Sequence, residues 1–452
     1  MKKSRIFLAT LLCAVIVIFA YRSWVDSSRA ASGLVEVANG DAQFWLMQGP
    51  PNNQYSLAPF TIEFDAPLDE ALLRDRLDEL ASAYQMFNRN IVEIGGLPYW
   101  QSVAVDWREN FRVLDAGESR LIRRQAELRR IQAARLDEGL TSFRAFLTPD
   151  RKQLVFVWHH VISDFEGMFN KHAKHLFNVT GARTQFGYQI HTTNTPGDAK
   201  RSANPPVNLS DVFNRPARPL GFTDADYLVT KVTLPIDDQS LHLSGKRAAL
   251  PMSDIFSFIA LRTATRYKDL AKEEDANSAP MRPLLSPISL RSSALDMDEG
   301  NNRAVKHFPF VLPLEDVSQM HQRITSLEST SGSYDQAGKL MKLARRAVFL
   351  EPWLRSVSMP DYISNYFPLA DMPLAIGGSQ LVAHNLRVPM VPYEQVKFAW
   401  SNYNGQVQLY LHTDPLLVDM ELMLKAFEQA SQEVLMYLHE FSQIAGSDPS
   451  AT

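Results

Sequence analysis

The chain has 452 residues, of which 45% are hydrophobic and 21% are charged, a composition typical of folded domains rather than of disordered or fibrous proteins. This length exceeds that of one ordinary hydrophobic core, so we expect two domains of about 200 residues each. The formal net charge of −4 gives no overall basic character, which argues against a nucleic acid as partner.

The single cysteine, Cys13, lies in an apolar segment near the N-terminus. The rest of the chain therefore has no internal disulfide, no cysteine-based metal site and no cysteine nucleophile. This count alone excludes several classes of enzyme.

The N-terminal segment from Ile6 to Tyr21 has no charge and follows three basic residues. It is either a signal peptide, cleaved near Ser28-Arg29-Ala30, or a membrane anchor over residues 6–24 with Trp24 at the interface. The segment is longer than most signal-peptide cores, so we favour an uncleaved single-pass anchor. The basic flank then stays in the cytoplasm and the folded domain is extracytoplasmic, with export after signal cleavage as the alternative.

Strands and helices alternate in the first half. We expect a strand at 59–65, an amphipathic helix after Pro67, and a hairpin of 91–94 with 99–103. Residues 118–137 predict a helix with a basic face that is either solvated or holds an anionic donor. Strands at 143–147 and 154–158 and a helix at 165–177 follow.

Five prolines between Pro196 and Pro219 mark residues 178–222 as a crossover linker. Beyond it we expect a strand at 227–234, a helix capped by Ser253, and strands at 284–290 and 307–312. A hairpin around Asn404-Gly405 and a helix at 419–441 close the chain. The pattern predicts an α/β fold of two lobes, 34–177 and 223–445, after an anchor and linker at 1–33.

The most informative stretch is LVFVWHHVISDFEG, from Leu154 to Gly167. A buried strand ends on His159 and His160, and Asp164 lies four residues beyond the second histidine. Strand alternation directs the two imidazoles to opposite faces, so only one of them can act as a base on a hydroxyl or amine. The plainer explanation stays open: one histidine is packed, the other is exposed, and Asp164 caps the next helix.

Metal binding and serine hydrolysis are weaker interpretations. His172 and His175 have i, i+3 spacing, but no HExxH or carboxylate-flanked pair accompanies them, so we expect no metal site. The stretch Gly377-Gly378-Ser379 lacks the trailing glycine of a nucleophile elbow. No glycine-rich loop for nucleotide phosphates is present either.

The segment His159-His160-Val-Ile-Ser-Asp164 resembles the HHxxxD motif of the superfamily that contains chloramphenicol acetyltransferase, condensation domains, BAHD acyltransferases and wax ester synthase/diacylglycerol acyltransferases. Further stretches follow in that family's usual order over nearly all of residues 40–440. They are the FRAFL strand, the MSDIFSFIALRTA helix, SPISLR with Gly300-Asn301, Ser364-Asn365 and the FAWSNYNGQVQLYL hairpin.

The resemblance implies two chloramphenicol-acetyltransferase-like lobes, each a mixed sheet with flanking helices, that meet at an active-site channel. It implies that His160 is the general base for direct attack of a hydroxyl or amine on an activated acyl ester. Asp164 would be a structural brace paired with Arg291, and His159 would be structural. Ser364 and Asn365 are candidate oxyanion donors.

By the same resemblance, the co-substrate is acyl-CoA or an acyl-carrier thioester, and no cofactor is bound. A lipid or a glycan is among the acceptors to consider. One departure from the motif is that Phe165 and Glu166 precede Gly167, whereas most members have glycine directly after the acid. Phe165 would narrow the channel or indicate a different donor. The alternative is a catalytically degenerate binding or scaffolding protein at a membrane.

Overall fold

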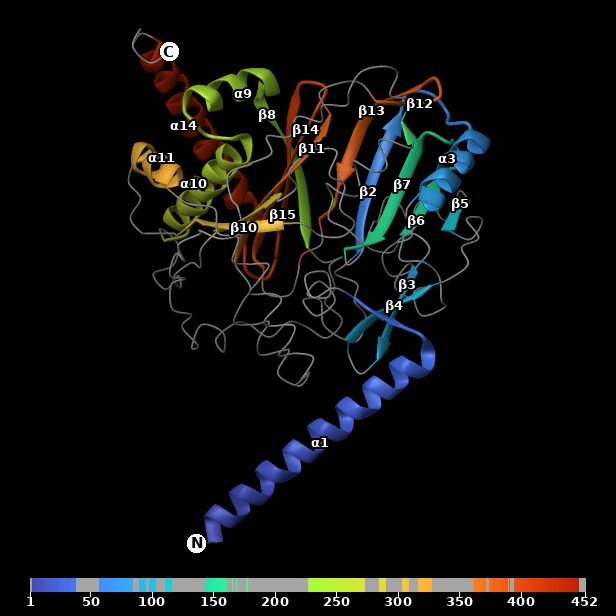
Figure 1. Cartoon of the computed structure of the whole chain (residues 1–452). Helices are drawn as coiled ribbons and strands as arrows, with labels where there is room; N and C mark the ends of the chain where they lie inside the picture. Colours follow the sequence, from blue (N-terminus) through green and yellow to red (C-terminus); the bar gives the residue numbers. More distant parts are fainter. Residues whose placement is uncertain are drawn as a thin grey trace.

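The computed structural model describes residues 2–37, 57–83, 89–94, 97–102, 110–115, 143–160, 165, 168, 176–177, 227–272, 284–289, 303–308, 316–326, 361–370, 374–388, 390 and 394–446. In this part, two six-stranded sheets lie between helices on the outside, and a three-stranded sheet lies next to the N-terminal helix (Figure 1). The predicted basic helix at 118–137 and the crossover linker at 178–222 lie outside the described residues.

The first large sheet has the strand order β12-β13-β2-β7-β6-β5. Its strands are β2 (Leu57–Phe64), β5 (Phe111–Val113), β6 (Phe143–Leu147), β7 (Gln153–His159), β12 (Ala375–Ile376) and β13 (Ser379–Leu386). The helix α3 (Glu70–Ala83) begins after Asp69, whose carboxylate accepts from the Ala71 and Leu72 amides. Its apolar stripe of Leu73, Leu77 and Leu80 is buried in the same core as β2 and β7.

Strands β12 and β13 come from the second half of the sequence. β13 pairs antiparallel with β2, so that His384 lies opposite Ile62 and Leu386 opposite Phe60. The predicted lobes 34–177 and 223–445 therefore do not coincide with the two large sheets, because residues of the second lobe supply two strands to the first sheet.

The second large sheet has the order β10-β9-β11-β14-β15-β8. Its strands are β8 (Leu228–Asp237), β9 (Leu284–Ser289), β10 (Arg303–Phe308), β11 (Tyr362–Ala370), β14 (Val396–Tyr403) and β15 (Gln406–Thr413). Four helices lie beside it: α9 (Asp238–Arg247), α10 (Met252–Lys272), α11 (Val317–Ser326) and α14 (Met420–Gly446) (Figure 1). The β14–β15 hairpin confirms the Asn404-Gly405 turn, since both residues have positive φ, as a type I′ turn requires.

The two faces of β14 pack against different cores. Val396, Phe398 and Trp400 are buried with the helices α10 and α14. Ala399 and Tyr403 belong to the core of the first sheet. Strand alternation thus gives the second sheet one helix-covered face and one face toward the first sheet.

The small sheet, ordered β1-β4-β3, consists of β1 (Val35–Glu36), β3 (Arg89–Ile94) and β4 (Leu97–Ser102), which confirms the predicted hairpin. The helix α1 (Lys2–Ser32) leads directly into it and projects away from the body of the molecule (Figure 1). Within the described part of the chain, no helix combines the length and the apolar character needed to cross a membrane.

Candidate functional site

The motif strand β7 is central in the first sheet, between β2 and β6. Its apolar residues from Leu154 to Trp158 are all buried, as the β-branched and aromatic pattern predicts. His159 ends the strand, where its backbone pairs with Leu57 of β2, and His160 follows in a turn with a half-buried side chain. Before this turn, Phe156 and Trp158 mark one side of β7, because strand residues two apart share a face.

On that side of β7, Trp158 belongs to an aromatic cluster with Phe60, Phe165 and Phe367. The Phe165 ring is only 5% exposed and makes edge contacts with Phe60 of β2 at 5.2 Å and with Phe367 of β11 at 5.0 Å between ring centroids. Trp158 lies 6.2 Å from the same ring. The residue that departs from the family motif therefore fills space between the first and second sheets.

Ser364 and Asn365 lie on β11, on opposite faces of the second sheet. The Ser364 hydroxyl accepts a hydrogen bond from Trp400 Nε1 at 3.2 Å, so Ser364 belongs to the helix-covered face. Asn365 shares the face of Phe367, and it is paired in register with Ala399 of the core that includes the first sheet. Asn365 is 91% buried, and its Oδ1 has no hydrogen-bond partner among the described residues. Of the two predicted oxyanion donors, Asn365 is the one on the face toward the first sheet, and the donor role of both stays a prediction.

The other predicted site residues lie outside the described residues. They are Asp164, Gly167 and Arg291, together with the histidines 172 and 175 considered for a metal and the side chain of His159. Their predicted roles stay predictions. Among the side chains that the structure does describe, no cluster of three or more His, Cys, Asp or Glu residues could hold a metal ion.

A second polar group between the sheets has no counterpart in the sequence motifs. His384 Nε2 of β13 is hydrogen-bonded to Ser401 Oγ of β14 at 2.7 Å. The Tyr410 hydroxyl donates to the His384 carbonyl oxygen at 2.7 Å, and it also lies 3.0 Å from Gln408 Oε1. Burial, with a smaller contribution from the Lys231 ammonium, lowers the pKa of His384 to about 3.

His384 and Ser401 connect the first sheet to the second. Ser401 is fully buried and His384 is 4% exposed, so a substrate has no direct access to either side chain. We therefore assign the pair to the junction between the sheets. No sequence signal identifies it, because its geometry depends on β13 crossing to the first sheet.

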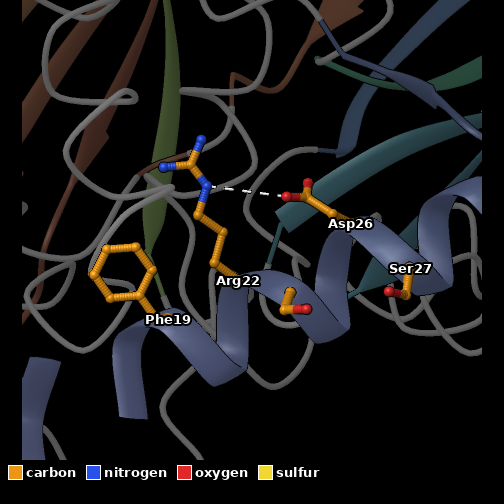
Figure 2. A pocket seen from close by; sticks show the side chains of 5 residues that line it. Phe19, Arg22, Asp26 and Ser27 are labelled. Carbon is orange, nitrogen blue, oxygen red and sulfur yellow. Dashed lines mark ion pairs between the residues drawn. The ribbon is translucent and has the colours of Figure 1, made fainter. Parts of the chain in front are cut away.

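A depression on α1 is lined by none of the predicted site residues. Figure 2 shows it lined by Phe19, Arg22, Asp26 and Ser27, with Ser23 completing the lining. Arg22 Nε lies 3.9 Å from Asp26 Oδ2, and both side chains are more than half exposed. Such a pair on one helix turn contributes little to stability.

By sequence, the chain matches no protein-family model and no curated protein. Solved structures, by contrast, match over most of its length. A mutant starter condensation domain of rhizomide synthetase RzmA, in complex with C8-CoA and Leu-SNAC, has a TM-score of 0.56 at 13% identity, over 94% of this chain and 98% of its own.

Two further condensation domains match similarly. That of the Monacolin K polyketide synthase MokA has a TM-score of 0.56 at 10% identity, over 90% of this chain and 98% of its own. The first condensation domain of the CDA synthetase has a TM-score of 0.52 at 14% identity, over 93% and 97% of the two chains. The chain therefore has the two-lobed α/β fold of condensation domains, as the resemblance of its HHxxxD motif predicts.

Proposed function

We propose that the protein is an acyltransferase that moves an acyl group from a thioester or other activated ester to a hydroxyl or amine acceptor. The observation that carries this proposal is the position of His160. In a condensation-domain fold it directly follows the central strand β7, has a half-buried side chain, and comes two residues after Trp158, whose ring contacts Phe165 between the two sheets.

In the proposed reaction, His160 takes the proton from the acceptor O–H or N–H. At the same time, the lone pair of the acceptor oxygen or nitrogen attacks the acyl carbonyl carbon. The new C–O or C–N bond forms, the C–S bond of the thioester breaks, and the leaving thiolate receives the proton from His160. Asn365 presents a side-chain amide on the face toward the first sheet, where its NH₂ group would donate to the carbonyl oxygen as negative charge develops. The pairing of Asp164 with Arg291 would brace the loop after His160.

The donor class is proposed from the fold. The RzmA domain was crystallised with C8-CoA, which supports acyl-CoA or an acyl-carrier thioester as co-substrate here. Because acyl-CoA is a cytosolic metabolite, an extracytoplasmic domain would use an exported activated acyl group instead. A reporter fused to the C-terminus determines the side of the membrane.

Attachment to a membrane through residues 6–24 is part of the proposal. The uncharged stretch from Ile6 to Tyr21 after a basic flank supports a single-pass anchor with an extracytoplasmic domain. Tyr21 and Val25 pack against Tyr99 of β4, upstream of the cleavage site considered at residues 28–30. A retained segment is supported by this packing, which export after signal cleavage would remove.

The test uses the full-length protein, because truncation at residue 30 would strip Tyr21 and Val25 from their contacts. C8-CoA is supplied with a panel of alcohols and amines, and acylated products are measured by mass spectrometry. We expect His160→Ala to reduce product formation by at least about 100-fold, the usual contribution of general-base catalysis. The exposed His439 of α14 provides a control, His439→Ala, that retains activity. Wild-type turnover by His160→Ala would contradict the proposed mechanism.

The second candidate is a catalytically degenerate binding or scaffolding protein. Phe165 favours it, because its ring occupies the space between β2 and β11. Calorimetry separates the two: binding of acyl thioesters by the wild-type protein without product from any acceptor would support the degenerate protein over the enzyme.

A further inference from the structure

The junction between α1 and the folded body is rigid. Gly33 follows the last helical residue with a φ of +62°, and the Leu34 amide donates to the Arg29 carbonyl oxygen at 3.4 Å. This is the Schellman arrangement, in which a left-handed glycine closes the helix end. β1 starts at Val35 and pairs at once with Trp100 of β4, so no flexible linker separates helix and sheet.

Side chains reinforce the junction on both sides. Val25 and Leu34 are buried with Tyr99 of β4, and Tyr21 packs against the same cluster. Arg29 Nη1 forms an ion pair with Glu36 Oε1 at 2.9 Å across the turn. The direction in which α1 leaves the body is therefore fixed by apolar packing, backbone pairing and one ion pair together.

Beyond this cluster, three described residues of α1 present apolar side chains to solvent. Ile16, Val17 and Phe19 are 57%, 66% and 69% exposed, which is costly for large apolar groups in water. Residues 2–20 extend from the body by about 28 Å, at about 1.5 Å per helical residue. Tyr21 and the exposed Trp24 mark the end of this apolar stretch, as interfacial aromatic residues do.

The same side of the molecule holds the end of β7 that carries the histidines. In Figure 1 the arrow of β7 points toward the small sheet and α1, and Leu57, opposite His159, starts β2 at this end. The other end of β2 lies beside Gln380, whose carbonyl oxygen accepts from the Asp65 amide at 2.9 Å. Eight strand residues separate the two ends, about 25 Å.

We propose that α1 turns the His160 end of the molecule toward the bilayer, so that the acceptor is a lipid embedded in that bilayer and bearing a hydroxyl or amine. This inference rests on the proposed function of His160 for its chemistry, whereas the orientation rests on the α1 junction and on the proposed attachment of α1 to the membrane. With this orientation, a lipid acceptor reaches His160 directly from the membrane surface and does not have to diffuse through water.

The orientation is tested without any activity. Because Cys13 is the single cysteine, Cys13→Ser provides a background for one dye at a time. Dyes on Gln101→Cys of β4 and on Gln380→Cys, both exposed positions, are compared in phosphatidylcholine vesicles that carry a headgroup quencher. We expect the dye at position 101 to be quenched several-fold more than the dye at position 380. Equal quenching, or stronger quenching at position 380, would overturn the inference.

The acceptor is tested with C8-CoA and two alcohols, hexadecanol embedded in the vesicles and soluble hexanol. We expect the embedded alcohol to be preferred by about tenfold, and a flexible Gly/Ser insertion between Gly33 and Leu34 to remove this preference while hexanol turnover stays unchanged. The same insertion in the Asn404-Gly405 turn is the control. Equal use of both alcohols would refute the lipid acceptor and leave the proposed function intact. Acylation of neither alcohol nor any soluble acceptor, with C8-CoA and with a second activated acyl ester as donor, would refute the proposed function.

Discussion

His384 is held neutral by its surroundings. Its ring is buried between β13 and β14, Ser401 satisfies Nε2, and burial lowers its pKa from 6.5 to about 3. In the unfolded chain the imidazole is hydrated and titrates near 6.5. Between these two values the unfolded state binds the extra proton, so stability depends on pH.

We expect His384 to destabilise the protein as the solution is acidified. The free energy of unfolding keeps its full value with respect to His384 above pH 6.5. It falls by up to about 1.4 kcal/mol per pH unit as pH falls from 6.5 toward 3. Urea unfolding at pH 7, 6 and 5 measures this slope. His384→Gln should flatten this slope, whatever its effect on stability at pH 7. An unaltered slope in His384→Gln would show that this histidine does not contribute.

Single residues of the site were predictable from the sequence to different degrees. The position of His160 follows from a local pattern, a buried strand that ends in a polar turn, and the structure places it there. Ser364 and Asn365 are adjacent in sequence, yet strand alternation gives them different neighbours. Only the packing of β11 shows which of the two lies on the helix-covered face and which on the face toward the first sheet. The pair of His384 with Ser401 needs two strands from different sheets, so no local pattern could predict it.

The helix α9 illustrates what packing demands of one element. It starts after Asp237, whose carboxylate accepts from the Ser240 amide at 2.8 Å, and it contains Gly245 in its buried face. A Cβ on Gly245 would lie 2.6 Å from Ile255 Cδ1 and 2.7 Å from the Leu250 carbonyl oxygen. The glycine therefore permits the close approach of α9 to the start of α10.

We predict that Gly245→Ala destabilises the protein by about 1–3 kcal/mol, because the backbone carbonyl cannot move aside easily. At a solvent-exposed position inside a helix, replacing glycine by alanine stabilises by about 1 kcal/mol. A loss of stability in Gly245→Ala would therefore indicate the steric contact. Gly378→Ala is the matched control, since nothing lies within 4 Å of a Cβ there. Denaturant midpoints measure both variants, and a Gly245→Ala protein as stable as wild type would contradict the close approach.

Most elements with strong local patterns were predicted correctly. β2, α3, the β3–β4 hairpin, β6, β7 and the β14–β15 hairpin lie within a few residues of their expected positions. The helix α10 begins at Met252 rather than after a cap at Ser253, because the Pro251 carbonyl oxygen already accepts from the Asp254 and Ile255 amides. The elements that were not predicted include α9, α11, β11 and β13: α9 is polar with an internal glycine, and β13 becomes a strand through its pairing with β2. The strand expected at 307–312 lies earlier, as β10 at Arg303–Phe308.

At the scale of the whole molecule, Tyr403 secures β13 and its approach to the first sheet. Its hydroxyl donates to the Leu381 carbonyl oxygen at 3.0 Å and accepts from the Leu374 amide at 3.1 Å. Tyr403 itself belongs to β14, so one side chain of the second sheet bonds to Leu374, just before β12, and to Leu381 of β13.

We expect Tyr403→Phe to cost about 1–3 kcal/mol, because two buried backbone groups lose their partner. Hydrogen exchange followed by mass spectrometry should show faster exchange confined to residues 374–386. Tyr366→Phe removes a comparable hydroxyl, which donates to Asn402 Oδ1 at 3.1 Å on the helix-covered face, and should leave that segment protected. Unchanged exchange in Tyr403→Phe would mean that strand pairing alone holds β13.

The crossing of β13 also constrains how the protein is made. Asp65 at the end of β2 is separated from its partner Gln380 by 315 residues, so one edge of β2 has no partner strand until most of the chain has been synthesised. At about 5–20 residues per second, this wait lasts about 15–60 s. An uncovered strand edge presents unpaired N–H and C=O groups that can pair with other chains, so we expect nascent chains that end before Gln380 to aggregate more readily than the full-length protein.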